Sequence, residues 1–217
     1  MKTRETGFTL IEIAIVLVII GLLLGGVLKG QELITGARVR NLIQQQDGIK
    51  GAYFGFLDRY RALPGDYANA FTTIPNMTAG CNSGNGNGNG QIATASNEHT
   101  LAWEHLARAG FINGSYTCAA TVSAGTSPAN PYAQFLVVVY DANYAGNAQA
   151  RHNLKTGAAV PSDILAEVDR KVDDGNATEG SFRGQIGGGV DATAANCYTD
   201  AWVTTTPGLN CGGVTLF

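Results

Sequence analysis

One carboxylate stands inside the most apolar part of the chain. Residues 8–28 contain a single charged residue, Glu12, and no proline. A charge at the centre of a bilayer costs about 2.5–3.5 kcal/mol on insertion scales, so such a residue usually has a partner. No Lys, Arg or His follows Glu12 within two helical turns. If the chain were cut between Gly7 and Phe8, the new α-amine, with a reference pKa of about 8, would place a cation four residues from Glu12.

A second group of oxygen ligands occurs in the C-terminal half of the chain. Calcium takes six to eight hard oxygens from a flexible turn, and five side chains there could contribute to such a set. They are Asp169, Asp173, Asp174, Asn176 and Glu179. Their spacing differs from that of the EF-hand loop, and an Asp-Gly turn is also a common way to leave a helix. The sequence therefore predicts either a calcium site or an ordinary helix exit.

Two other patterns lack the spacing that their chemistry needs. His99 and His105 are six residues apart and point in directions about 120° apart on a helix, so they cannot share one metal ion. Residues 82–90 read NSGNGNGNG, but no apolar strand precedes them and they lack the spacing of phosphate-binding loops. We therefore expect packed or solvated histidines and a surface loop. Motifs such as G-x-S-x-G and H-E-x-x-H do not occur in the sequence, which disfavours an enzyme.

The four cysteines all follow the apolar segment and show no C-x-x-C spacing. They are Cys81, Cys118, Cys197 and Cys211. Disulfides formed in an oxidising compartment are therefore expected. Chain order suggests Cys81 with Cys118 and Cys197 with Cys211, and the other two connectivities stay open. The second pair would close a fifteen-residue loop, which contributes about 3 kcal/mol in the chain-entropy model.

A long helix over residues 8–61 must carry Glu12. At 1.5 Å per residue, residues 8–28 span about 31 Å, which matches a bilayer core of about 30 Å. A secretory signal peptide has a shorter apolar region and ends at a small-residue cleavage site, and neither holds here. Apolar residues then recur at spacings of three, four or seven up to Tyr60, as in an amphipathic helix. Leu63-Pro64-Gly65-Asp66 should end the helix, because proline disfavours helix in the residue before it.

The rest of the chain predicts a small head of mixed elements. Residues 96–109 should form a helix. Residues 134–140, QFLVVVY, predict a central strand of a small antiparallel sheet. Residues 161–172 predict a second short helix, with Ser162 or Asp163 placed to cap its start. The expected fold class is α+β, with a long N-terminal helix packed on a small antiparallel sheet and short helices.

The run Gly7-Phe8-Thr9-Leu10-Ile11-Glu12 resembles the start of type IV pilins and of the pseudopilins of type II secretion. In that family, prepilin peptidase removes a short charged leader on the cytoplasmic side of the membrane and methylates the new N-terminal residue. The resemblance implies cleavage after Gly7, N-methylation of Phe8 and a cytoplasmic N-terminus. It also implies that the Glu12 carboxylate meets the N-terminal amine of a neighbouring subunit during assembly.

The resemblance further implies a pilin-like α+β fold in four segments. These are residues 1–7 as leader, 8–28 as transmembrane and filament-core helix, 29–63 as its amphipathic continuation, and 64–217 as a periplasmic or extracellular head. Pilins often carry a C-terminal disulfide loop, which Cys197 and Cys211 would close. Some secretion pseudopilins bind calcium in a C-terminal loop, and no other cofactor is expected.

These patterns favour a structural subunit of a type IV pilus or of a type II secretion pseudopilus. Its partners would be copies of itself, other pilin-like subunits, prepilin peptidase and an inner-membrane assembly platform. It would start as a single-pass protein of the bacterial inner membrane and end in a periplasmic or cell-surface filament. The net charge of −3 and the lack of a Lys/Arg cluster disfavour nucleic acid as a partner. Two alternatives are a minor pilin whose head is an adhesin or ligand-binding module, and a membrane-anchored periplasmic enzyme.

Overall fold

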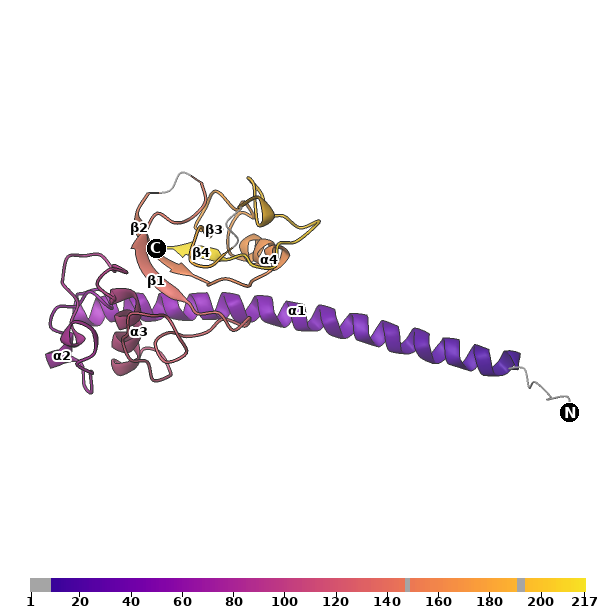
Figure 1. Ribbon diagram of the computed structural model, residues 1–217, viewed down its shortest axis with the longest axis horizontal. Helices are drawn as coiled ribbons and strands as arrows, with labels where there is room; N and C mark the ends of the chain where they lie inside the picture. Colours follow the sequence, from indigo (N-terminus) through magenta and orange to yellow (C-terminus); the bar gives the residue numbers. More distant parts are fainter. Residues whose placement is uncertain (1–8, 147–148, 191–193) are drawn as a thin grey trace, which may run out of the picture. The chain divides into compact units, whose positions relative to one another are not determined.

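One helix runs through both parts of the molecule. The structure, a computed structural model, describes residues 9–146, 149–190 and 194–217. Contacts divide the chain into two compact units, Met1–Arg38 and Val39–Phe217. Helix α1 (Leu10–Tyr60) starts in the first unit and ends in the second (Figure 1). The long N-terminal helix predicted from the sequence is therefore confirmed for the residues that the structure describes.

In the first unit α1 is apolar and exposed. All side chains from Leu10 to Lys29 are exposed, and an 18-residue window of the helix has a mean hydropathy of 2.8. Leu33 and Ile34 continue this exposed apolar surface past an ion pair between Lys29 and Glu32 (2.6 Å). The length and composition of the helix suit a membrane crossing. Exposed apolar surface on this scale marks contact with a membrane or with other protein.

The second unit is built on a four-stranded antiparallel sheet. Its strands are β1 (Val137–Asp141), β2 (Arg151–Lys155), β3 (Phe182–Gly184) and β4 (Gly213–Leu216), in the order β1-β2-β4-β3. Leu154 pairs with Thr215, and Thr215 Oγ1 donates to Gln46 Oε1 of α1 (2.8 Å). Because side chains alternate along a strand, Leu154 lies on the face that packs against α1. Its neighbour Lys155 lies on the opposite face. With the long helix, this sheet confirms the α+β class.

Short helices complete the second unit: α2 (Ala70–Thr73), η1 (Cys81–Gly84), α3 (Glu98–Arg108), α4 (Ser162–Val172) and η2 (Ala194–Asn196). α3 and α4 confirm the two predicted helices of the head. The predicted cap of α4 is wrong, because Pro161 occupies the N-cap position and no side chain caps the helix. Ser162 Oγ donates instead to the carbonyl of Val203 (2.5 Å), and Asp163 Oδ1 accepts the N–H of Ile164 (2.9 Å).

β1 begins at Val137, after the predicted start of this strand. Asn130 closes a turn just before it, since its Oδ1 accepts the N–H of Gln134 (3.0 Å) and its N–H donates to the Gln134 carbonyl (2.7 Å). This turn keeps Gln134 and Phe135 out of the ladder with β2. β1 also lies at an edge of the sheet. The predicted central position is wrong, because the C-terminal strand β4 occupies the interior beside β2.

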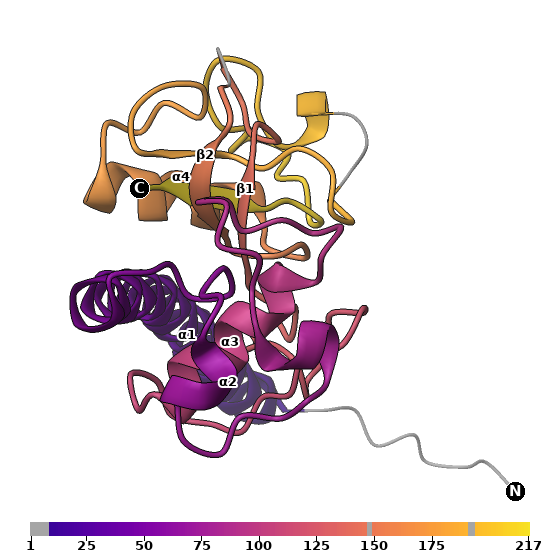
Figure 2. The same cartoon turned by 90° about the vertical axis from the view of Figure 1, so that its left-hand side faces the viewer.

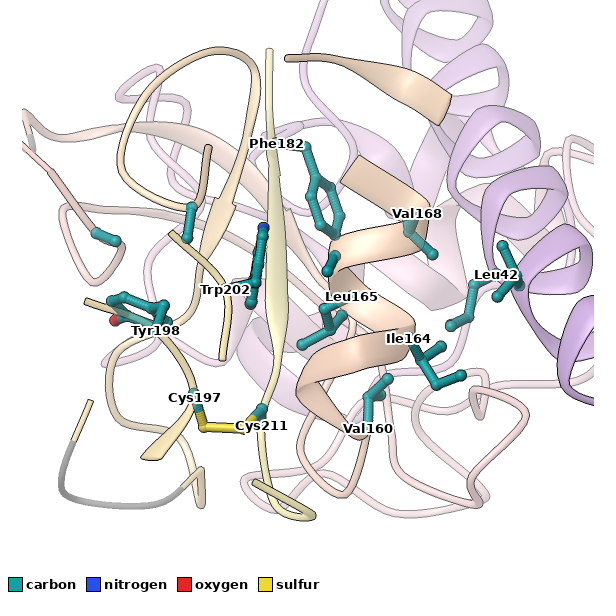
Figure 3. Close-up of a cluster of buried hydrophobic side chains, with 14 residues drawn as sticks. Leu42, Val160, Ile164, Leu165, Val168, Phe182, Cys197, Tyr198, Trp202 and Cys211 are labelled. Atoms are coloured by element: carbon teal, nitrogen blue, oxygen red, sulfur yellow. A yellow bond between two sulfur atoms is a disulfide. The ribbon is translucent and has the colours of Figure 1, made fainter. Parts of the chain in front are cut away.

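Two clusters of buried side chains hold the second half of α1 against the rest of its unit. One cluster joins Phe56 of α1 to Trp103 of α3 and Val138 of β1. Figure 2 shows this part of α1 and α3 on the same side of the sheet. The other cluster joins Leu42 of α1 to α4 and Trp202 (Figure 3). The apolar stripe predicted on the second half of the helix is therefore its contact with the core.

The glycine-rich loop 82–90 lies mostly on the surface, as predicted, but buried acids hold its backbone. Asp66 accepts the N–H groups of Asn89 (3.0 Å) and Gly90 (2.7 Å), and Glu98 accepts a further N–H of the same loop (3.0 Å). Both acids are buried. A Cβ added at Gly86 would lie 2.2 Å from the carbonyl carbon of Asp66. Only glycine permits this approach of two backbone segments.

Candidate functional site

Glu12 sits in the first turn of α1 and caps its start. Thr9 donates to Glu12 Oε2 from its N–H (2.8 Å) and from its Oγ1 (2.8 Å), and the N–H of Glu12 donates to Thr9 Oγ1 (3.3 Å). This arrangement is a capping box, in which Thr and a Glu three residues later satisfy free N–H groups at a helix start. The Thr-x-x-Glu spacing in the sequence is typical of this cap. The pairing of Glu12 with an amine is predicted from the sequence, whereas its role in the cap is not.

Both bonds from Thr9 end on the same carboxylate oxygen of Glu12. Within the described part of the chain, no hydrogen bond or ion pair reaches Glu12 Oε1. The second oxygen is therefore available to a donor from another molecule. Gly7 and Phe8, the predicted cleavage and methylation residues, lie outside the described residues. Cleavage, methylation and pairing with the amine stay predictions.

Three of the five predicted calcium ligands come together at the C-terminal end of α4. Carboxylate oxygens of Asp169, Asp173 and Asp174 lie within 4.8 Å of one another. Glu179 is exposed and lies outside this group. Asn176 Oδ1 accepts two hydrogen bonds from within its own turn (3.0 and 3.1 Å). The structure thus forms an acidic turn but does not gather the complete predicted set.

Several of these oxygens already bind protein groups. Buried Asp169 accepts the indole N–H of Trp202 at Oδ2 (2.7 Å) and the N–H of Gly175 at Oδ1 (3.3 Å). Burial raises the pKa of Asp169 to about 6, against the lowering effect of these two hydrogen bonds. Asp173 accepts two backbone N–H groups at the start of β3. The turn is therefore a well-bonded helix exit, and calcium binding stays a prediction.

The cysteines pair in the order suggested by the chain. Cys81 bonds to Cys118 and Cys197 to Cys211, each with Cα atoms 5.6 Å apart. The second disulfide lies in the same buried cluster as Trp202 and α4 (Figure 3). It joins the segment before β4 to the core near the N-terminal end of α4, where Cys211 pairs with Val160. The acidic turn lies at the other end of this helix.

His105 is a buried structural residue of α3. Its Nδ1 accepts the N–H of Gly65 (2.9 Å), so its proton is on Nε2, which lies 3.2 Å from the Gly84 carbonyl. Burial lowers its pKa to about 4, although the Gly84 carbonyl and the charge of Glu104 act in the opposite direction. Both ring nitrogens are therefore committed to the turn after α1 and to the glycine-rich loop.

The N-terminal segment matches a known sequence motif. Residues 2–28 match the prokaryotic N-terminal methylation motif. The chain carries the signature of type IV pilins and pseudopilins. No curated protein and no solved structure matches the chain.

This pilin-type motif covers residues 2–7 of the predicted leader, the predicted cut after Gly7 and the apolar part of α1 up to Leu28. It supports a pilin or pseudopilin precursor and suggests a structural subunit rather than an enzyme. It implies processing by prepilin peptidase and assembly with other pilin subunits. Together with a helix apolar enough to cross a membrane, it fits an inner-membrane anchor.

Proposed function

We propose that the chain is the precursor of a filament subunit of the type IV pilus or type II secretion pseudopilus kind. The observation that carries the proposal is the pilin-type motif, which includes the exposed apolar part of α1. In this proposal, residues 1–7 are the leader and 8–28 anchor the subunit in the inner membrane with the N-terminus in the cytoplasm. Residues 29–63 continue the helix, and 64–217 form the head in the periplasm or on the filament.

Assembly moves the apolar half of α1 from lipid into a bundle of helices. Lipid tails are as apolar as leucine, so helix packing and polar pairing must drive this exchange. The polar pair is the Glu12 carboxylate of one subunit with the Phe8 amine of its neighbour. The capping box supports this pairing, because it holds Glu12 at the helix start and leaves Oε1 without a partner among the described residues.

Two substitutions separate the charge of Glu12 from its role as a cap. Glu12→Gln keeps an oxygen that can accept from Thr9 but removes the charge, whereas Glu12→Val removes both. In cells that make the full chain and its assembly machinery, we expect both variants to insert and to lose the leader. Electron microscopy should show no filaments from either variant, because the amine of the neighbour has no carboxylate to meet.

Thr9→Ala is the matched control. It removes the hydroxyl of the capping box and leaves the charge of Glu12, so we expect filaments from this variant. Normal filaments from Glu12→Gln would overturn the charge pairing. An intact leader on the wild-type chain in these cells, seen by mass spectrometry, would overturn the proposed function as a whole.

A further inference from the structure

The second unit contains a cavity on the face of the sheet opposite α1. Its volume is about 370 Å³, which falls within the usual range for small-molecule sites. Val137, Val139 and Asp141 of β1 and Lys155 of β2 line it. These side chains share one face because Val137 pairs with Lys155, and Val139 and Asp141 follow Val137 at the two-residue period of a strand. The cavity therefore has the sheet as its floor.

A buried ammonium with unused hydrogen-bond donors lines this cavity. The side chain of Lys155 is 8% exposed, and its Nζ lies 2.5 Å from Asp141 Oδ2. An ammonium has three N–H donors, and among the described residues Asp141 is the one partner of Lys155. Asp141 also accepts from Asn143 (3.0 and 3.2 Å) and from Asn153 (3.0 Å). The carboxylate is thus well bonded, whereas the ammonium has two donors to spare.

Two buried acceptors of residues that line the same cavity also lack partners. Gln185 and His99 both line the cavity and are at least nine-tenths buried. Gln185 Oε1 and His99 Nδ1 have no hydrogen-bond partner among the described residues. Burial lowers the pKa of His99, although the Ala93 carbonyl acts in the opposite direction. The imidazole is therefore neutral at pH 7, and Nδ1 can be its acceptor nitrogen. A buried acceptor left without a partner is destabilising, so a donor from a bound molecule would be favourable here.

The remaining wall of the cavity is partly apolar and also contains the polar side chains of Thr94, Gln134 and Asn143. Phe135, Val122 and Ala158 line it together with the two valines of β1. A bound molecule must therefore offer carbon surface as well as polar groups. The charges of Lys155 and Asp141 offset each other, so the cavity does not select an anion by charge. An entirely apolar ligand would leave the donors of Lys155 and the acceptor of Gln185 unmatched.

We propose that this cavity binds a small, neutral, hydroxyl-rich molecule, such as a single sugar unit of a glycan. Each hydroxyl donates one hydrogen bond and accepts others, so one sugar can accept from Lys155. It can also donate to Gln185 and His99 once these buried acceptors turn toward the cavity. The C–H groups of the ring then pack on the valines and Phe135. The inference concerns the head alone and does not depend on filament assembly.

Saturation-transfer NMR on the full chain in lipid nanodiscs tests the proposal. Nanodiscs avoid glycoside detergents, which would compete for the site. The probes are D-glucose, D-galactose, D-mannose and N-acetyl-D-glucosamine, with succinate as a carboxylate probe. We expect saturation transfer to at least one sugar and none to succinate.

A filled cavity and a matched substitution elsewhere locate the binding. Val137→Phe fills the cavity without removing a hydrogen-bonding group of the side chain, and should raise the dissociation constant of the bound sugar at least tenfold. Val172→Phe makes the same change at the exposed end of α4, outside the cavity, and should leave binding unchanged. Equal melting temperatures of the variants establish folding. Transfer to none of the sugars, transfer to succinate instead, or undiminished binding by a folded Val137→Phe variant would each overturn the proposal.

Discussion

At the level of single residues, the head holds buried acids with backbone N–H groups instead of cations. Glu104 of α3 is fully buried and accepts the N–H groups of Thr78 (2.9 Å) and Cys118 (2.8 Å). It thereby joins two segments that are distant from α3 in sequence. The sequence could not predict this, because a helical Glu is usually solvated. The sequence did identify Glu12 as a lone charge, since the apolar residues around it are its neighbours in sequence. Its pairing with an amine stays a prediction.

Two buried titratable residues change the stability of the fold in opposite directions between about pH 4 and 6.5. Burial raises the pKa of Asp169 to about 6. Its contribution to stability is present below its unfolded pKa of 3.8 and is lost as pH rises through about 6. Burial lowers the pKa of His105 to about 4. Its contribution is present above its unfolded pKa of 6.5 and is lost as pH falls through about 4.

Asp169→Asn should reveal the pH dependence of stability that His105 causes, because it removes the opposing contribution of Asp169. The amide keeps an oxygen for the Trp202 N–H but cannot ionise. Relative to wild type, the free energy of unfolding of the variant should fall more steeply as pH is lowered from 7 to 4. The extra change is up to about 3 kcal/mol, from a shift of roughly two pKa units. Urea denaturation at a series of pH values measures it, and parallel curves for the two proteins would contradict the assignment.

At the level of elements, two of the alternating glycines in the loop 82–90, Gly84 and Gly86, reflect close packing of backbone on backbone. Periodicity in the sequence identifies a loop here, because a run of Asn and Gly has no apolar face. It cannot show that Asp66 and Glu98 lie beneath the loop. That contact depends on α3 and the turn after α1 meeting in the folded head, and both acids are distant enough in sequence to escape any local pattern.

Gly86→Ala tests this packing. The new Cβ would meet the backbone of Asp66 at 2.2 Å, so one segment must move and the bonds from Asp66 to the loop must weaken. We expect a loss of about 1–3 kcal/mol or more in the free energy of unfolding. Gly125→Ala is the control, since its nearest atom would be 4.0 Å away. Equal stability of the two variants in chemical denaturation would contradict the packing account.

The turn after α4 provides the test of calcium binding. We expect calcium to raise the melting temperature of the full chain, because it would offset the repulsion among three neighbouring carboxylates. Asp174→Asn should abolish the rise while keeping an oxygen for the N–H of Asn176. Asp163→Asn, at the other end of α4, should not. Calorimetric titration that gives no heat, with an unchanged melting temperature, would contradict calcium binding at this turn.

The short strands show where sequence patterns fail. β2 reads Arg-His-Asn-Leu-Lys and β3 has three residues, so neither has a recognisable apolar alternation. They are strands because β1 and β4 pair with them. The cavity could not be predicted from the sequence either, since Lys155 lies next to Val137 only through the register of β1 with β2. Pairing between distant segments, rather than local propensity, decides these positions.

At the level of the whole molecule, the recognisable signal and the folded head lie mainly in different parts of the chain. The pilin-type motif ends at Leu28, within the first unit, where sequence alone specifies helix and apolar surface. The second unit holds the disulfides, the acidic turn and the cavity. Its chemistry follows from contacts that only the fold creates. The apolar helix suits a membrane, whereas the disulfides of the second unit need an oxidising compartment. This difference can be tested.

The final prediction separates membrane insertion from processing. In the proposed function, the apolar helix holds the chain in the membrane and the head forms its disulfides in an oxidising compartment. In cells that lack prepilin peptidase, we expect the full chain to keep its leader and still form Cys81–Cys118 and Cys197–Cys211. The reason is that translocation of the head across the membrane does not require leader cleavage. All four cysteines should then resist maleimide until a reductant is added. With the peptidase present, the mature protein should begin at a methylated Phe8 and show the same protection. Cysteines that react without reductant would place the head in the cytoplasm and contradict the topology, whereas a different first residue would contradict only the cleavage site.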